Sequence, residues 1–149
     1  MVEAYVAAAT KGTGTSAEKA YLAAARITLE KLRDVQEADS ILATYRSQFP
    51  AGFYKNEAAF LAARILVKQK RYAEARTQIA GIYEHRGEFE RAIAEVEWAR
   101  EIHESRPLDL YLASLRAKAG DLDDALAFLQ QLLDESPDDA EILYNIGVI

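Results

Sequence analysis

A glycine-rich loop, two histidines and many carboxylates are the features of this 149-residue chain whose residue types could do chemistry. The loop reads TKGTGTS over residues 10–16, a composition suited to cradling a phosphate. A nucleotide-binding P-loop, however, carries its lysine after the last glycine, at the start of a helix, and preferably follows a strand. Lys11 precedes both Gly12 and Gly14, and no strand pattern comes before it. The stretch is therefore predicted to be a flexible loop between two helices.

The two histidines do not have the spacing of a metal site. His85 and His103 are 18 residues apart and fall in different predicted helices. The chain has no cysteine, which excludes disulfides and thiolate zinc sites. No Ser-His-Asp arrangement is present, and the carboxylates mark helix starts and exposed faces rather than an acid-base pair. We predict no catalytic residue, no metal ligand and no cofactor, and we expect a protein that is not an enzyme.

Charge is unevenly distributed along the chain. The net charge of −6 argues against a general nucleic-acid binder. Residues 119–149 hold eight acidic residues and no basic one, whereas residues 55–76 hold six basic and two acidic residues. One interpretation is that these are solvated faces and helix-start acids that complement the helix dipole. The other is a dipolar molecule that steers a charged partner.

The chain shows no signal for a membrane. Its apolar runs are interrupted by charge within a few residues, so no transmembrane span is expected. The first residues, MVEAYVAAATKG, lack a basic leader followed by a long apolar stretch. We expect no membrane insertion and a cytoplasmic location. The alternative location is periplasmic, or within a longer protein anchored to the cell envelope.

The composition and its periodicity favour helices throughout. Half of the residues are apolar, and only three prolines and seven glycines are present. No stretch alternates as a strand does, and Thr15-Ser16-Ala17-Glu18 fits a capping box at the start of the second helix. Trp98 has apolar residues at helical spacing, which favours core packing over a stacking platform. The predicted helices are 2–10, 16–32, 34–49, 56–69, 71–85, 88–104, 107–119, 121–135 and 138–149. Because the breaks are short, neighbouring helices must lie antiparallel.

Three stretches of the chain repeat one pattern of small and apolar residues. In each, a small residue is followed twelve residues later by an alanine that opens the next helix, and an apolar residue stands three before that alanine. The pairs are Ala63 and Ala75, Ala80 and Ala92, and Ala113 and Ala125, with apolar residues Tyr72, Phe89 and Leu122. We predict that the alanines lie where paired helices cross. The apolar residue is expected to fill the space beneath the turn.

This pattern resembles the tetratricopeptide repeat, a helical hairpin of 34 residues. The likeness is clearest over 107–149, where Leu112-Ala113 stands at the family's Leu-Gly and Gly120-Asp121-Leu122 at its Gly-Asp-Tyr turn. Further matches are Ala125, Leu129 and Pro137, then Leu143, Ile146 and Gly147 of a following repeat, and earlier Ala38, Leu42 and Pro50. Two positions depart from the family's pattern, because Asp109 replaces its tryptophan and Arg116 its tyrosine.

The resemblance implies an all-α fold, a right-handed α-α superhelix in which antiparallel helical hairpins stack as a solenoid. We expect a short helix and loop at 1–15 and a repeat array at 16–149, with about 3.5–4 repeats of which the last is incomplete. The alanines of successive second helices, Ala38, Ala75, Ala92 and Ala125, are 37, 17 and 33 residues apart. Because 17 is half a repeat, we predict one irregular half-repeat in the middle, with the helix at 71–85 belonging to two hairpins.

Arrays of this kind present a groove lined by the first helix of each hairpin, which accepts an extended peptide or a partner helix. The resemblance implies a non-catalytic scaffold or adaptor whose partner is a protein or peptide. Carried onto this sequence, the groove positions are Phe60, Leu61, Arg64, Lys68, Tyr111, Ser114, Lys118, Tyr144, Asn145 and Val148. This mixture suits a partner with acidic and apolar groups. Packing against neighbouring helices is the alternative role for several of these side chains.

The last predicted helix raises an alternative function, a structural or assembly segment of a larger repeat protein. Its apolar stripe consists of Ile142, Leu143, Ile146 and Ile149, and the sequence stops before a second helix that would cover the stripe. Burying each such side chain contributes about 1.5–3 kcal/mol. We therefore expect either a fragment of a longer protein or a homo-oligomer whose copies associate through this stripe.

Overall fold

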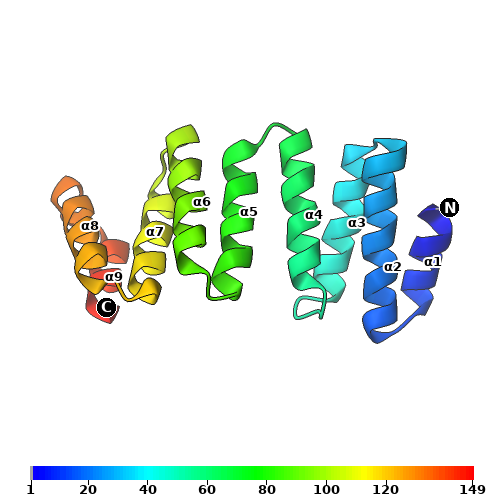
Figure 1. The fold of residues 1–149 in the computed structure, drawn as a ribbon, viewed down its shortest axis with the longest axis horizontal. Helices are drawn as coiled ribbons and strands as arrows, with labels where there is room; N and C mark the ends of the chain where they lie inside the picture. The colour runs from blue at the N-terminus through cyan, green and yellow to red at the C-terminus, as the bar shows by residue number, and fades with distance from the viewer. Residues whose placement is uncertain (1) are drawn as a thin grey trace. The chain divides into compact units, whose positions relative to one another are not determined.

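The computed structural model describes residues 2–149. Helices make up most of these residues, and none of them forms a strand (Figure 1). The helices are α1 (Val2–Lys11), α2 (Gly14–Ile27), η1 (Thr28–Leu32), α3 (Val35–Gln48), α4 (Lys55–Lys68), α5 (Tyr72–His85), α6 (Phe89–Ile102), α7 (Arg106–Ala119), α8 (Leu122–Glu135) and α9 (Ala140–Val148). The second predicted helix continues from α2 into η1, which is a π-helix. The prediction of an all-α fold of helical hairpins is confirmed.

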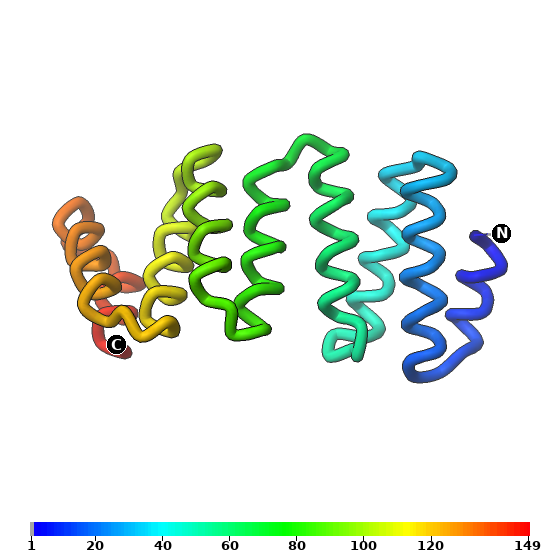
Figure 2. The backbone as a smooth tube through the Cα atoms, viewed as in Figure 1, coloured from blue at the N-terminus to red at the C-terminus, as the bar shows by residue number. Residues whose placement is uncertain are grey.

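The chain divides into two compact units, and the division falls within α5. The N-terminal unit extends to Gln78 and holds α1 to α4 with the first half of α5. The C-terminal unit, Ile79–Ile149, holds the second half of α5 with α6 to α9. Within each unit, successive helices run in opposite directions (Figure 2). Each unit is therefore a small stack of antiparallel helices with its own core.

Buried alanines mark the helix crossings in both units. The alanines predicted there are all at most 3% exposed: Ala38, Ala63, Ala75, Ala80, Ala92, Ala113 and Ala125. A methyl side chain allows two helix axes to approach closely, which explains why alanine recurs at these places. The residues predicted to fill the space beneath the turns behave differently, since Tyr72 is 49% and Leu122 46% exposed. That part of the prediction is wrong for these two side chains, because about half of each is exposed to solvent.

One kind of turn recurs at four links between helices. It places a residue in the left-handed region: Arg33 (φ 56°), Lys70 (φ 61°), Gly87 (φ 72°) and Gly120 (φ 97°). In the last three links the N–H of the following residue donates to the carbonyl five residues before it, as in a Schellman motif. Lys70 precedes α5 and Gly87 follows it, so turns of this kind stand at both ends of that helix. The irregular half-repeat predicted in the middle of the chain stays a prediction.

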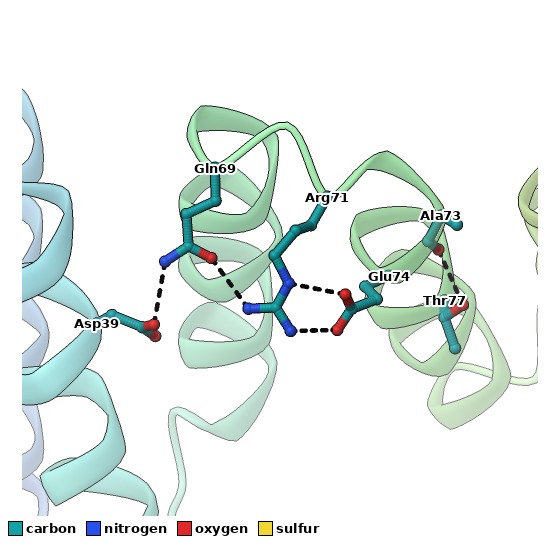
Figure 3. Close-up of polar contacts among 6 residues, drawn as sticks. All are labelled: Asp39, Gln69, Arg71, Ala73, Glu74 and Thr77. Carbon is teal, nitrogen blue, oxygen red and sulfur yellow. Dashed lines mark hydrogen bonds and ion pairs between the residues drawn. The ribbon is translucent and has the colours of Figure 1, made fainter. Parts of the chain in front are cut away.

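Side chains hold the α4–α5 link against α3 (Figure 3). Gln69 Nε2 donates to Asp39 Oδ2 at 3.2 Å, and Arg71 Nη1 donates to Gln69 Oε1 at 3.1 Å. The Arg71 guanidinium also makes a two-point pair with Glu74 in the first turn of α5. The left-handed backbone at Lys70 is therefore flanked on both sides by residues whose side chains are tied down.

Glu18 is a buried carboxylate rather than the capping-box acid that the sequence suggests. It is 4% exposed. Helix α2 begins at Gly14, with Thr13 at the N-cap and no side-chain hydrogen bond there. The capping-box prediction is wrong because the helix starts two residues earlier than the motif requires, and Glu18 is buried in the core instead.

Glu18 joins three segments of the N-terminal unit. Its carboxylate accepts hydrogen bonds from Tyr45 Oη at 2.9 Å and from the backbone N–H groups of Phe53 and Tyr54, each at 3.2 Å. These partners lie on α3 and on the link before α4. A Cβ placed on Gly52 would lie 2.3 Å from Glu18 Oε2. Only glycine therefore lets the link pass over the buried acid.

Trp98 lies on the exposed side of α6. The buried side of this helix consists of Ala92, Val96 and Ala99, each 0% exposed. Trp98 is 53% exposed, and Ile102, one turn further on, is 54% exposed. The prediction of core packing for Trp98 is wrong because the buried positions of α6 are taken by smaller side chains on the opposite face.

Candidate functional site

The predicted groove residues of α4 lie in the N-terminal unit and do not share one environment. Leu61 is 6% exposed and packs in the core, whereas Phe60 is 56% exposed. Arg64 and Lys68 are exposed and border a pocket of about 630 Å³. This cationic pocket, between η1, the start of α3 and α4, is lined by Leu29, Glu30, Arg33, Val35, Arg64 and Lys68.

The electrostatics of the cationic pocket are set by three cations and one carboxylate. Arg64 Nη1 lies 2.8 Å from Glu30 Oε1, and both side chains are partly exposed. The hydrogen bond from Arg64, aided by the nearby charges of Arg26 and Lys31, holds the pKa of Glu30 below its usual range. The pocket therefore keeps a surplus of positive charge while its one acid stays ionised.

The predicted groove residues of α7 and α9 lie in the C-terminal unit. Both helices contribute side chains to a second pocket, of about 300 Å³. This C-terminal pocket is lined by Ser114, Ala117, Lys118, Leu122, Leu129, Asn145, Val148 and Ile149. Four predicted groove residues therefore come together here: Ser114, Lys118, Asn145 and Val148. Tyr144 is 70% exposed on α9 outside this lining, and Tyr111 lies half-buried one turn before Ser114.

Glu84 of α5 fixes two of the predicted groove side chains. Its carboxylate accepts a hydrogen bond from Tyr111 Oη at 2.8 Å and pairs with Lys118 Nζ at 2.5 Å. Burial raises the pKa of the Glu84 carboxyl, but the bonds from Lys118 and Tyr111 outweigh that effect and hold it below its usual range. Burial together with the Glu84 carboxylate raises the pKa of Tyr111, so this hydroxyl remains a donor.

Glu84 was missed by the sequence analysis although a signal for it was present. It stands 34 residues before Lys118, which is one repeat length. The predicted groove residues lie on α4, α7 and α9. None was predicted on α5, because the repeat pattern fits this helix both as a first and as a second helix of a hairpin. Treating α5 as the first helix of a hairpin would have placed Glu84 in the groove opposite Lys118.

The apolar stripe predicted for self-association faces largely inward. Ile142 is 0% exposed and packs with the core residues Leu110, Ala113, Leu129 and Leu132. Ile146 and Ile149 are partly buried against the same cluster. The exposed apolar side chains of α9 are Leu143 (49%), Tyr144 (70%) and Val148 (60%). Self-association stays a prediction, and only Leu143 of the four proposed residues lies on the exposed side.

The two departures from the repeat pattern, Asp109 and Arg116, belong to one charged cluster. Asp109 is 8% exposed and accepts a hydrogen bond from Arg100 Nε at 2.6 Å. The guanidinium carbons of Arg100 and Arg116 lie 5.2 Å and 5.1 Å from the centre of the Phe128 ring. Arg116 also pairs with Glu97 at 3.2 Å. Ion pairs and cation–π contacts thus join α6, α7 and α8 where the family keeps two aromatic side chains.

The loop that has the composition of a phosphate site is a tight link. Helix α1 continues through Lys11, and the N–H of Gly12 donates to the carbonyl of Ala8 at 2.8 Å. Gly14, with φ +62°, already opens α2. The predicted flexible loop is therefore reduced to Gly12 and Thr13 between two packed helices.

The two histidines do not form a metal site among residues 2–149. His85 ends α5 and His103 follows α6, and both are exposed. Within residues 2–149, no group of three or more histidine, aspartate or glutamate side chains is placed to hold a metal ion. In the same residues, no helix combines the length and the apolar character needed to cross a membrane.

Comparison with known proteins identifies one part of the chain. The family model described as tetratricopeptide repeat matches residues 106–149, which span α7, α8 and α9. No curated protein matches the chain. All the residues that line the C-terminal pocket lie in the matched segment, whereas Glu84, which pairs with Lys118, lies outside it. Repeats of this family are generally non-catalytic and are typical of protein–protein interaction scaffolds.

Proposed function

We propose, from the premise that residues 106–149 form a tetratricopeptide repeat, that this chain is a non-catalytic scaffold whose C-terminal pocket binds a protein segment. The observation that carries the proposal is the gathering of four groove positions around one pocket of about 300 Å³. These positions come from two first helices, α7 and α9, with α8 behind them. A segment lying across α7 and α9 would contact all four.

The chemistry of the C-terminal pocket indicates what such a segment presents. Its apolar side chains are Leu122, Leu129, Val148 and Ile149, which favour an apolar anchor. Ser114 and Asn145 stand at the same pocket and supply hydroxyl and amide groups for backbone hydrogen bonds. We infer a partner segment with one apolar side chain in the pocket and its backbone along α7.

The Glu84 carboxylate holds two side chains next to this site in place. By pairing with Lys118 and accepting a bond from Tyr111, it holds two long side chains in one conformation before a partner arrives. Such preorganisation lowers the entropy that is lost on binding. It also neutralises Lys118, so the pocket favours an apolar anchor over an isolated acidic one.

Capture of partners from the native host tests the proposal with a matched pair of variants. Val148→Asp together with Asn145→Ala changes the exposed rim of the pocket without touching the core residue Ile142. The control, Gln130→Ala together with Gln131→Ala, alters exposed positions of α8. We expect a partner that is captured by the native chain and the control but lost with the pocket variant. Equal capture by all three chains would contradict the use of this pocket.

The alternative function, an assembly segment, is favoured by one observation. Leu143, Tyr144 and Val148 form an exposed apolar face on α9, and such a face is more often covered by another protein surface than left in water. Light scattering at micromolar concentration distinguishes the two functions. Association that disappears with Leu143→Gln and Tyr144→Gln would favour the assembly function.

A further inference from the structure

The two units of the chain carry opposite net charge. Up to Gln78 there are twelve lysines and arginines and eight aspartates and glutamates, a net charge of +4. From Ile79 onward there are six basic and sixteen acidic residues, a net charge of −10. The overall charge of −6 conceals this separation. Every copy of the molecule therefore carries a unit of positive net charge and a unit of negative net charge.

The positive surface is concentrated at the cationic pocket of the N-terminal unit. Arg33, Arg64 and Lys68 line it, and only Arg64 is paired, with Glu30. Among residues 2–149, no ion pair involves Arg33 or Lys68. The pocket also has apolar lining, because Leu29 is 5% exposed and Val35 packs against the core. Its volume of about 630 Å³ leaves room for side chains from outside.

Arg33 stands in the turn between η1 and α3. Its φ of 56° lies in the left-handed region, which a side chain disfavours. The corresponding turns of the C-terminal unit carry Gly87 and Gly120 at that place. Lys70 has the same conformation (φ 61°) without lining the pocket, so the inference rests on the charge and the apolar lining of the pocket.

The negative unit offers a surface of complementary chemistry on the outer side of α8. Asp123 and Asp124 are exposed in its first turn, beside Leu126, which is 36% exposed, and the exposed Ala127. Among residues 2–149, no ion pair involves either aspartate. We name these four residues the acidic face of α8. It combines two free carboxylates with an apolar centre, and none of its residues lines the C-terminal pocket.

We propose that the cationic pocket of one copy of this chain binds the acidic face of α8 on a second copy. In this contact Asp123 and Asp124 meet Arg33 and Lys68, while Leu126 covers Leu29 and Val35. The two surfaces are different, so the contact is heterologous and leaves each pair of copies with one free pocket and one free acidic face. The contact lies apart from the C-terminal pocket, and its existence does not depend on a partner there.

The association is expected to depend on salt. Charge pairs at the rim of an interface are screened at high ionic strength, whereas an apolar contact through α9 is not. Sedimentation velocity of the full chain over a range of concentrations, in about 0.1 M and about 1 M NaCl, measures this difference. We expect self-association that weakens roughly tenfold in the higher salt. A chain that is monomeric in both, or that associates equally in both, overturns the proposal.

Charge reversal then identifies the surfaces. One variant carries Arg33→Glu and Lys68→Glu, and the other carries Asp123→Lys and Asp124→Lys. Each alone is expected to lose association, because both of its surfaces then have the same sign. An equimolar mixture should recover it, because each variant supplies the charge that the other lacks. A mixture no better than its components overturns the assignment.

Matched controls separate the contact from net charge. Lys11→Glu with Lys55→Glu, and Asp134→Lys with Glu135→Lys, make the same charge changes at exposed positions outside both surfaces. These controls are expected to associate as the native chain does, and equal loss would overturn the proposal. If a reversal lowers thermal stability, Arg33→Gln with Lys68→Gln and Asp123→Asn with Asp124→Asn probe the same contact more gently. A native chain that stays monomeric yet binds soluble polyglutamate would assign the pocket to another protein's acidic segment.

Discussion

The N-terminal and C-terminal units build the same hairpin with different residues at the turn. The left-handed position is occupied by Arg33 and Lys70 in the first unit and by Gly87 and Gly120 in the second. Glycine adopts this conformation without a steric penalty, whereas a side chain does not. The comparison shows that the backbone of the turn is imposed by the packing of the two helices, since it persists where the residue is unsuited to it.

The units also differ in the partners of their buried carboxylates. The N-terminal unit buries one carboxylate, Glu18, and satisfies it with three donors. The C-terminal unit also buries a carboxylate, Asp109, but pairs it with the partly exposed Arg100 in a cluster around Phe128. A buried acid costs much when its partners are lost, while exposed pairs contribute little. The first unit should therefore depend more strongly on Glu18, which has three donors from two other segments, than the second depends on Asp109, whose partner is a partly exposed arginine.

Removal of Glu18 is expected to give the largest effect. Glu18→Ala leaves the Tyr45 hydroxyl and two backbone N–H groups without their acceptor, so the N-terminal unit should lose about 3 kcal/mol of stability. Hydrogen exchange measured by mass spectrometry should show faster exchange in α2 to α4 and little change in α7 to α9. Glu18→Gln keeps one acceptor oxygen and should lose less.

Equal acceleration of exchange in both units after Glu18→Ala would contradict this comparison. It would mean that the two units unfold together and that the division within α5 has no energetic counterpart. Gly52→Ala provides an independent check, because the added Cβ meets the same carboxylate and should destabilise the same helices.

Overpacking at a helix crossing is expected to be the next largest effect, and it falls on the other unit. Ala125 is 0% exposed between α8 and its neighbours, so Ala125→Leu should cost about 1–3 kcal/mol. The exposed Ala127, two residues later on the same helix, gives a matched control, and Ala127→Leu should be nearly neutral. Thermal melting with hydrogen exchange in α7 to α9 measures both, and equal melting of the two variants would remove Ala125 from the crossing.

The helices and their crossings could be predicted from sequence because both depend on short-range pattern. Alanine spacing located Ala38, Ala92 and Ala125 in the core, since only small residues allow the helices to approach there. The half-repeat spacing between Ala75 and Ala92 predicts an irregular repeat at α5, and this stays a prediction. These signals are local along the chain, so one sequence is enough to read them.

The exposure of individual side chains and their hydrogen-bond partners could not be predicted from sequence. Both depend on which side of a helix packs against another helix. Trp98 and Val96 are near neighbours in sequence, and apolar periodicity alone did not separate the exposed residue from the buried one. Glu18 fits a capping motif by spacing, yet its partners come from α3 and the link before α4, which no local rule specifies. Glu84 was missed for the same reason, because its partners are 27 and 34 residues away.

Acid should weaken the N-terminal unit by a smaller amount than the loss of Glu18. Burial raises the pKa of the Glu18 carboxyl, but the bonds from Tyr54, Tyr45 and Phe53 outweigh it and hold the pKa below its usual range. A group with a lowered folded pKa stabilises above its unfolded pKa and loses that contribution as pH falls through the folded value. Exchange in α2 to α4 should therefore accelerate below about pH 4.5, and Glu18→Gln should remove that share of the acid sensitivity.

Swapping the left-handed residues between the two kinds of turn should change the stability least. The two substitutions should have effects of opposite sign on the free energy of unfolding. Lys70→Gly relieves a left-handed side chain but adds freedom to the unfolded chain, for a net gain of about 0.5 kcal/mol. Gly87→Lys introduces the same strain at the other end of α5 and should cost about 1 kcal/mol. Melting temperatures of the two variants, measured beside the double exchange, report both signs. If Lys70→Gly is destabilising, then the side chains of Gln69 and Arg71 that flank the link stabilise the left-handed lysine, and the turn of the N-terminal unit has adapted to its residue.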